Sequence, residues 1–162
     1  MSSIQSQNEI SGQSRTYFGG NEVFFSFLRT IMRAIDRGVL EAEAFESIVR
    51  DWGVSLAEGI GLSDRIEVAL DQIAEMLSIL GLVRVFEPAE NNKGEYQVLV
   101  LRCMTSRYVG AYRNHQKLPT WNIIPLILEG ALGAIGLRYQ VTEIKDGMLH
   151  SDEYILHLTP KA

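Results

Sequence analysis

The stretch LPTWNIIPLILEGALGAIGLRYQVTEIKDGMLHSDEYILHL, residues 118–158, decides the fold. Its first part predicts a helix over about 119–135 that is too apolar to lie in water, with Gly136 as its stop. Pro125 inside this pattern predicts either a kink or a later start near Asn122. The second part predicts two paired strands, 138–144 and 152–158, joined through Asp146 and Gly147. The rest of the chain must therefore cover this helix.

Three helices and two strands are expected upstream of that stretch. Apolar spacing predicts helices over about 21–38, 41–58 and 63–81. Two strands are expected next, over 82–87 and 95–103, and Pro88 is expected to stop the first of them. Gly53 inside the second helix indicates close backbone packing. The third helix is expected to face inward through one set of side chains, Ile66, Leu70, Ile73, Leu77 and Leu80, and to carry an acidic strip of Asp64, Glu67, Asp71 and Glu75.

The order ααα–ββ–α–ββ predicts an α+β fold, with N-terminal helices and one long apolar helix packed on an antiparallel sheet. We expect residues 1–16 to form a disordered tail, because they are rich in Ser, Gln and Asn. Residues 17–162 are expected to form a single α+β domain. The 162 residues are enough for one domain with a real core.

The composition excludes several classes of protein. The net charge of −5 lacks the basic footprint of a nucleic-acid binder, and no apolar run is long enough to span a bilayer. One cysteine, Cys103, excludes an internal disulfide framework and a cysteine-clustered zinc site. The N-terminus lacks the pattern of a signal peptide, so a cytoplasmic location is expected.

Candidate chemistry is sparse. His115, His150, Cys103 and Asp152 match no metal-binding spacing, so we expect scattered polar residues and no metal. Cys103 fits a small buried hydrophobe better than a reactive thiol next to Arg102. The glycine run 130–136 lies inside a helix, where it favours close helix packing over dinucleotide binding. With no acid–base pair or cofactor motif, we expect neither catalysis nor a cofactor.

The chain resembles the 4-vinyl reductase family of small domains. The resemblance rests on FESIVRDWGVSLAEGIG, IAEMLSILGLVRVFE, YQVLVLRCMTSRYVG, the stretch 118–144 and the final YILHL, which together span roughly residues 22–158. It implies a fold similar to small subunits of the vesicle-tethering transport-protein-particle complex and to effector domains of some prokaryotic regulators. It also implies ligand binding and dimerisation more than a fixed reaction.

Many members of that family carry cysteines at the end of the second strand, before the long helix and in the last hairpin, where they can bind metal or an iron–sulfur cluster. Here only Cys103 stands at such a place, because Thr120–Asn122 and His150–Asp152 occupy the other two. A cluster-binding version is therefore not expected.

Two segments are the predicted ligand-binding site. The stretch 102–117 is basic, contains no acid and has interleaved tyrosines, which suits an anionic ligand. The apolar helix offers a wall for a hydrophobic ligand, in addition to its core role. The predicted ligand-binding residues are Arg102, Arg107, Tyr108, Tyr112, Arg113, Trp121, Ile124 and Leu128.

The aromatic cluster Phe24, Phe25 and Phe27 predicts a homodimer, because three such residues cannot share one helix face. The favoured function is a non-catalytic, ligand-binding and dimerising domain that acts as a sensor or scaffold. The alternative is a winged-helix-like DNA-binding regulator, since three helices precede a hairpin. The acidic third helix opposes that alternative, so nucleic acid is not an expected partner.

Overall fold

A computed structural model describes residues 24–92, 94–105, 122–144 and 152–162. It confirms the α+β class and the predicted order of elements. A helix over residues 24–36 comes first. The remaining described elements are α2 (Ala42–Ile60), α3 (Ile66–Ile79), β1 (Val83–Asn92), β2 (Glu95–Cys103), α5 (Ile124–Ala134), β3 (Tyr139–Ile144) and β4 (Tyr154–Pro160). The expected division into a tail at 1–16 and one domain lies partly outside the described residues and stays a prediction.

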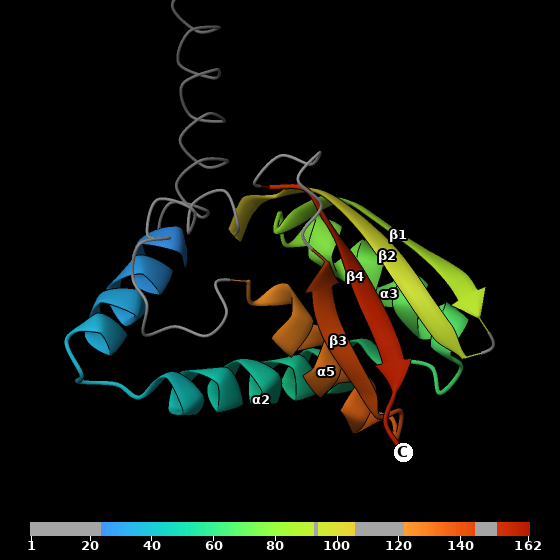
Figure 1. Cartoon of the computed structure of the whole chain (residues 1–162), viewed down its shortest axis with the longest axis horizontal. Coiled ribbons are helices and arrows are strands. Elements are labelled where there is room, and N and C mark those ends of the chain that lie inside the picture. Colours follow the sequence, from blue (N-terminus) through green and yellow to red (C-terminus); the bar gives the residue numbers. More distant parts are fainter. Residues whose placement is uncertain (1–23, 93, 106–121, 145–151) are drawn as a thin grey trace, which may run out of the picture.

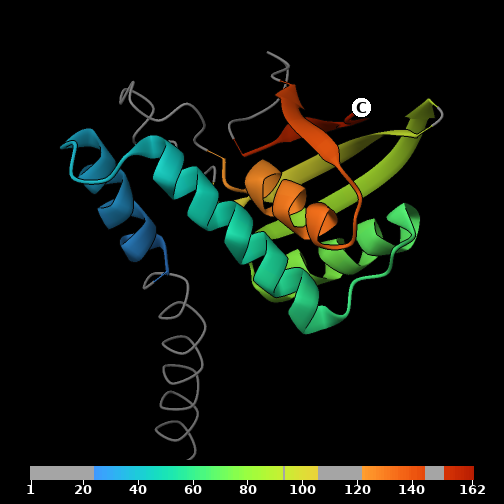
Figure 2. The same ribbon diagram turned by 90° about the horizontal axis from the view of Figure 1, so that it is seen from below.

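The four strands form one antiparallel sheet in the order β1-β2-β4-β3. The described helices cover one face of this sheet, with α3 and α5 next to the strands and α2 lying across α5 on the far side (Figures 1 and 2). The hairpin predicted from the C-terminal stretch is confirmed, because Val141 of β3 is paired with Leu158 of β4. The apolar helix α5 is thus enclosed between the sheet and α2.

The expected stop of the first strand at Pro88 is wrong. Strand β1 continues to Asn92, and Pro88 is paired with Val98 of β2. β1 is an edge strand with a neighbour on one side only. A proline, which lacks the backbone N–H, is tolerated in such a strand because one side needs no ladder bond.

Glycines let α2 and α5 approach until their backbones touch. A Cβ added at Gly53 would meet the carbonyl oxygen of Ile127, and one added at Gly130 would meet that of Arg50, both well under the 3.0 Å limit for real contacts. The predicted close packing is therefore confirmed at Gly53 and Gly130, but it is wrong for Gly133, where an added Cβ would meet nothing within 4 Å. Next to the crossing, Glu129 accepts hydrogen bonds from Arg50 Nε at 3.0 Å and from the backbone amide of Val141 at 3.2 Å. This carboxylate ties α2 and α5 to the edge strand β3.

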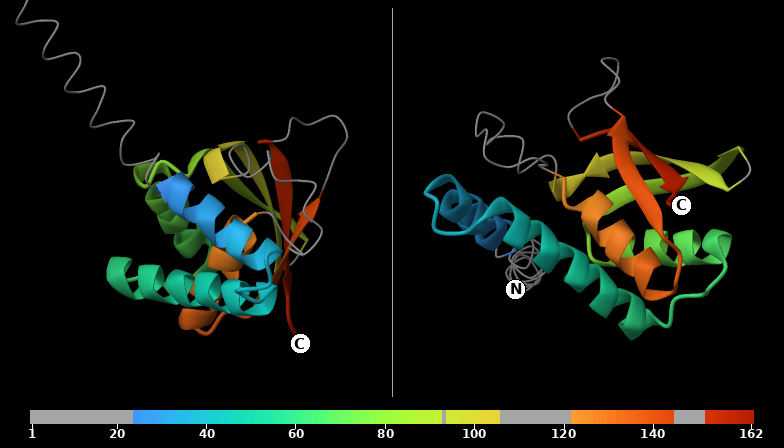
Figure 3. Two further views of the ribbon diagram at one scale, coloured as in Figure 1. Left: turned by 90° about the vertical axis from the view of Figure 1, so that its left-hand side faces the viewer. Right: turned by 60° about the horizontal axis from the view of Figure 1, so that its bottom comes forward.

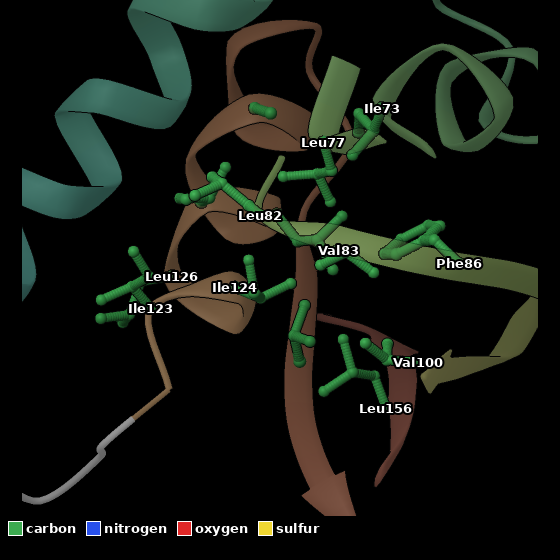
Figure 4. Packing of buried hydrophobic residues seen from close by; sticks show 14 of the residues in the cluster. Ile73, Leu77, Leu82, Val83, Phe86, Val100, Ile123, Ile124, Leu126 and Leu156 are labelled. Carbon is green, nitrogen blue, oxygen red and sulfur yellow. The ribbon is translucent and has the colours of Figure 1, made fainter. Parts of the chain in front are cut away.

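Pro125 predicted either a kink in the helix or a later start near Asn122, and the structure shows the later start. The helix begins at Ile124, with Pro125 in its first turn, where a missing N–H costs nothing. The Asn122 side chain accepts a hydrogen bond from the Ile124 amide at 3.1 Å. Residues 122–128 are all buried. In Figure 4, Ile124 points toward the strands, whereas Leu126 points away from them.

Helix α3 matches its predicted inward face except at its end. Leu70, Ile73 and Leu77 have no exposed surface, whereas Leu80 is 41% exposed. Leu80 lies just beyond the last helical residue, so the helical spacing no longer decides its direction. The predicted acidic strip is exposed at all four positions, Asp64, Glu67, Asp71 and Glu75.

Candidate functional site

Three of the eight predicted site residues lie in the described parts of the chain. Arg102 is exposed at the end of β2, whereas Ile124 and Leu128 are wholly buried in α5. The other five residues lie outside the described residues: Arg107, Tyr108, Tyr112, Arg113 and Trp121. The two described segments nevertheless meet, because the end of β2 and the start of α5 contact the same side chain of β4.

Arg102 has an unusual backbone, which redirects the residue that follows it. Its φ of 53° makes it the one described non-glycine residue with positive φ. In a regular strand, side chains alternate between the two faces, so Val100 and Cys103 would point to opposite sides. Both are fully buried instead, and Cys103 contacts the inward-facing Tyr154. The left-handed turn at Arg102 therefore brings the thiol into the core.

The thiol of Cys103 lies in a small buried polar group, which we call the polar cluster: Cys103, Thr105, Asn122 and Tyr154. The Cys103 Sγ and Thr105 Oγ1 atoms are 3.1 Å apart. The Tyr154 hydroxyl lies within donating distance of Cys103 Sγ, at 3.2 Å, and of Asn122 Oδ1, at 3.3 Å. A hydroxyl carries one proton, so these two acceptors share it.

Three segments that lie far apart in the sequence meet around Cys103: the end of β2, the segment before α5 and the residue Asp152 before β4. Cys103 is the last residue of β2, and Asn122 precedes α5. The backbone carbonyl of Asp152, which precedes β4, accepts a hydrogen bond from the Cys103 amide at 2.8 Å. The predicted burial of Cys103 is confirmed, but its polar neighbours were missed. Tyr154 fits the apolar alternation of a strand, so the sequence carries no signal that its hydroxyl meets a cysteine.

Burial raises the pKa of the Tyr154 hydroxyl well above its ordinary value, and the neighbouring Cys103 adds to the shift. The hydroxyl therefore stays protonated at neutral pH and acts as a donor. Apolar side chains of α5 begin directly beside this donor, and the exposed guanidinium of Arg102 lies one residue from the thiol. The arrangement combines an apolar wall, a buried hydrogen-bond donor and a nearby cation.

Metal ligands do not gather in the part of the chain that the structure describes. Among those residues, no three His, Cys, Asp or Glu side chains are placed to share an ion. His115 and His150 lie outside the described residues. His157 Nε2 is 3.5 Å from Glu95 Oε2, and both residues alternate with the inward-facing side chains of their strands.

The phenylalanine cluster divides between two environments. Phe25 is buried in the core, whereas Phe27 is 64% exposed. The Phe24 ring lies between them in exposure and contacts Trp52 of α2, with ring centroids 6.0 Å apart. The expectation that the three rings face different ways is confirmed, and the homodimer inferred from it stays a prediction. Within the described residues, no helix has the length and apolarity needed to span a membrane.

Comparison with known proteins supports the fold and leaves the family open. No protein-family model matches the chain, and no curated protein matches it in sequence. A trafficking protein particle complex subunit 3 from Naegleria fowleri, covalently bound to palmitic acid, has a similar structure with a TM-score of 0.53 and 16% identity, covering 86% of this chain and 92% of that one.

A second solved structure is more distant. The phenol-responsive sensory domain of the transcription activator PoxR, with phenol, has a TM-score of 0.49 and 20% identity, and the match covers 86% of this chain and 71% of that one.

The resemblance to the 4-vinyl reductase family finds no support among the family models, whereas the expected similarity to a small subunit of the transport particle is confirmed. The chain therefore has an α+β fold similar to that of a trafficking-complex subunit.

Proposed function

We propose that this chain is a non-catalytic, dimerising domain that binds an amphiphilic ligand with an apolar chain and an anionic head, and acts as a sensor or scaffold. The apolar part of the ligand would lie against α5 at Ile124 and Leu128. The head would lie near Arg102, where the basic stretch begins. Arg107, Tyr108, Tyr112, Arg113 and Trp121, which lie outside the described residues, complete the proposed site.

One observation carries this proposal: an apolar helix begins at a buried polar cluster beside an exposed arginine. Ligand sites are mostly apolar with a few well-placed polar groups, and the start of α5, next to the polar cluster, has this composition. The polar cluster supplies the Tyr154 hydroxyl, and Arg102 supplies a charge for a carboxylate. The trafficking subunit of similar fold is covalently bound to palmitic acid, which supports the apolar-chain part of the proposal.

Membership in the 4-vinyl reductase family, and a location in the cytoplasm, remain part of this proposal. The DNA-binding alternative gains no support from the described residues. The exposed face of α3 carries Asp64, Glu67, Asp71 and Glu75, which would repel the phosphates of a duplex.

Native mass spectrometry of the full chain, purified without added ligand, tests the proposal. The expected spectrum is a dimer with additional mass that is lost on denaturation. Mass that survives denaturation and is released by hydroxylamine would identify a thioester at Cys103, the chain's single cysteine. If no amphiphile copurifies and a series of fatty acids produces no adduct, the ligand part of the proposal is wrong.

Matched variants locate the ligand. Arg102→Glu should weaken binding of a fatty acid by about tenfold, because it replaces a favourable charge with a repulsive one. Arg138→Glu is the control, since Arg138 is also exposed but precedes β3, beyond the other end of α5. Equal losses of affinity in the two variants would indicate nonspecific attraction and would exclude a head-group site at Arg102.

A further inference from the structure

Two arginines lie opposite each other where β1 begins and β2 ends. Val83 of β1 pairs with Cys103 of β2, so their neighbours Arg84 and Arg102 are opposite each other in the sheet. Both arginines are exposed, whereas Val83 and Cys103 are buried. The two guanidinium groups therefore leave the core at the same place. Like charges that lie directly opposite each other destabilise a strand pair.

No acid offsets this repulsion in the part of the chain that the structure describes. Neither arginine forms an ion pair there, whereas Arg50 is paired with Glu129 at 3.0 Å. Arg102 also has a strained φ of 53°, at a position where glycine would be relaxed. Strain and repulsion without a compensating contact are typical of functional sites.

The arginine pair lies beside the polar cluster and the start of α5. Cys103, the residue after Arg102, is 3.2 Å from the Tyr154 hydroxyl, which is 3.3 Å from Asn122 Oδ1. In Figure 3 the end of β2 and the start of α5 lie at the same end of the sheet, away from the turn between β1 and β2. An anionic group held by the arginines would therefore lie next to the apolar residues of α5.

We infer that Arg84 and Arg102 form a clamp for a phosphate monoester, the head group of the amphiphile in the proposed function. The inference rests on that function and names the class of its ligand. One guanidinium can bind both oxygens of a carboxylate, so a carboxylate head leaves the second arginine unused. A phosphate monoester has three terminal oxygens and a charge of about −1.5 to −2 at pH 7, which matches two guanidinium groups.

Isothermal titration of the full chain with octyl phosphate, octanoate and octanol tests the clamp, because the three compounds share one apolar chain. Wild type should bind octyl phosphate about tenfold more tightly than octanoate, the effect of one further charge-assisted hydrogen bond, and octanol most weakly. Arg84→Gln should remove this preference for the phosphate. Arg138→Gln is the control and should keep it, because Arg138 is exposed beyond the other end of α5.

The outcomes separate the clamp from the proposed function. Octyl phosphate that binds no more tightly than octanoate would overturn the clamp and keep the proposed function, and an equal loss in Arg84→Gln and Arg138→Gln would do the same. A chain that binds none of the three compounds would overturn both. Inorganic phosphate should bind far more weakly than octyl phosphate, since it lacks the apolar chain. Equal affinity would assign the arginines to a free anion and overturn their role at a head group.

The melting temperature gives a second readout, which a purely structural role would not produce. Arg84→Gln removes one of two opposed like charges, so the unliganded variant should melt up to about 3 °C higher than wild type. Added octyl phosphate should raise the melting temperature of wild type more than that of the variant. A lower melting temperature of the unliganded variant would show that Arg84 holds the fold together, and it would contradict the clamp.

Discussion

Two buried regions hold α5: its crossing with α2, and its start beside the polar cluster, which we call the polar end of α5. They are built from opposite kinds of contact. At the crossing, Gly53 and Gly130 bring backbone against backbone, and no atom can be added. At the polar end, side chains of β2, β4 and the segment before α5 share hydrogen bonds around the Tyr154 hydroxyl. Backbone packing has one geometry, whereas hydrogen bonds can be exchanged for others. The crossing therefore fixes α5, and its polar end is where the proposed ligand would compete for hydrogen bonds.

The largest effect is expected from breaking the crossing. Gly130→Ala places a Cβ on the Arg50 carbonyl oxygen, so α2 and α5 must move apart. We expect a loss of about 3 kcal/mol in the free energy of unfolding, the upper range for overpacking a core. Urea denaturation measures it.

Gly133→Ala is the control in the same helix, because a Cβ there has no neighbour within 4 Å. It should stabilise the chain by up to about 1 kcal/mol, since alanine is the better helix former. Equal effects of the two substitutions would show that the crossing is not tightly packed.

The second largest effect is expected at the polar cluster. Tyr154→Phe removes the one donor that Cys103 Sγ and Asn122 Oδ1 share, at almost constant volume. Asn122 Oδ1 keeps the Ile124 amide as a donor, and Cys103 Sγ keeps Thr105 Oγ1 at 3.1 Å, so the loss is that of one buried hydrogen bond, about 0.5–1.5 kcal/mol. Thermal unfolding of Tyr154→Phe measures this cost. Tyr139→Phe is the control and should cost less, because the Tyr139 hydroxyl donates to the Gly94 carbonyl in a partly buried place.

Fatty-acid affinity should distinguish the polar cluster from the α2–α5 crossing. If the polar end is where the ligand head binds, then Tyr154→Phe should change fatty-acid affinity, whereas a crossing variant that still folds should not. The same affinity in wild type and Tyr154→Phe would assign the polar cluster to stability alone.

Sequence reasoning predicted the crossing better than the polar end, for a physical reason. A glycine inside a helix is costly, so Gly53 and Gly130 signal a local need for space without any knowledge of the partner. The polar cluster combines residues 103, 105, 122 and 154, and its members are ordinary where they stand. The positive φ of Arg102 leaves no trace in the sequence, and neither does the edge position of β1 that makes Pro88 acceptable.

A smaller effect is expected at Glu129, which joins the crossing to β3. Glu129→Gln keeps an acceptor for the Val141 amide but loses the charge facing Arg50, whose side chain is partly exposed. Water screens such a pair, so we expect a loss of about 0.5–1 kcal/mol that shrinks with added salt. Glu46→Gln removes only the i,i+4 partner of Arg50 at 3.7 Å and should cost less. A loss that salt does not reduce would mean that the charge is not responsible.

The smallest effect is expected away from both regions, at a tyrosine that donates to a carboxylate on the surface. The Tyr96 hydroxyl donates to Glu67 at 3.1 Å, and burial followed by this bond raises the pKa of Tyr96 to about 12. Because the folded-state pKa is raised, the associated stability is complete below the ordinary value of 10.0 and is lost as pH rises toward 12. Near neutral pH this contribution is therefore fully present, and Tyr96 adds no pH dependence to stability there.

Ultraviolet titration of tyrosinate, with Tyr96→Phe to assign the signal, measures this pKa. Glu67→Gln should move the titration of Tyr96 to lower pH, because the negative charge disappears while burial, the larger cause, remains. The shift should leave the pKa above 10.0, unlike that of a tyrosine in water. A pKa that returns fully to the ordinary value would mean that the carboxylate dominates. It would then weaken the parallel conclusion that burial is the main cause of the raised pKa of Tyr154.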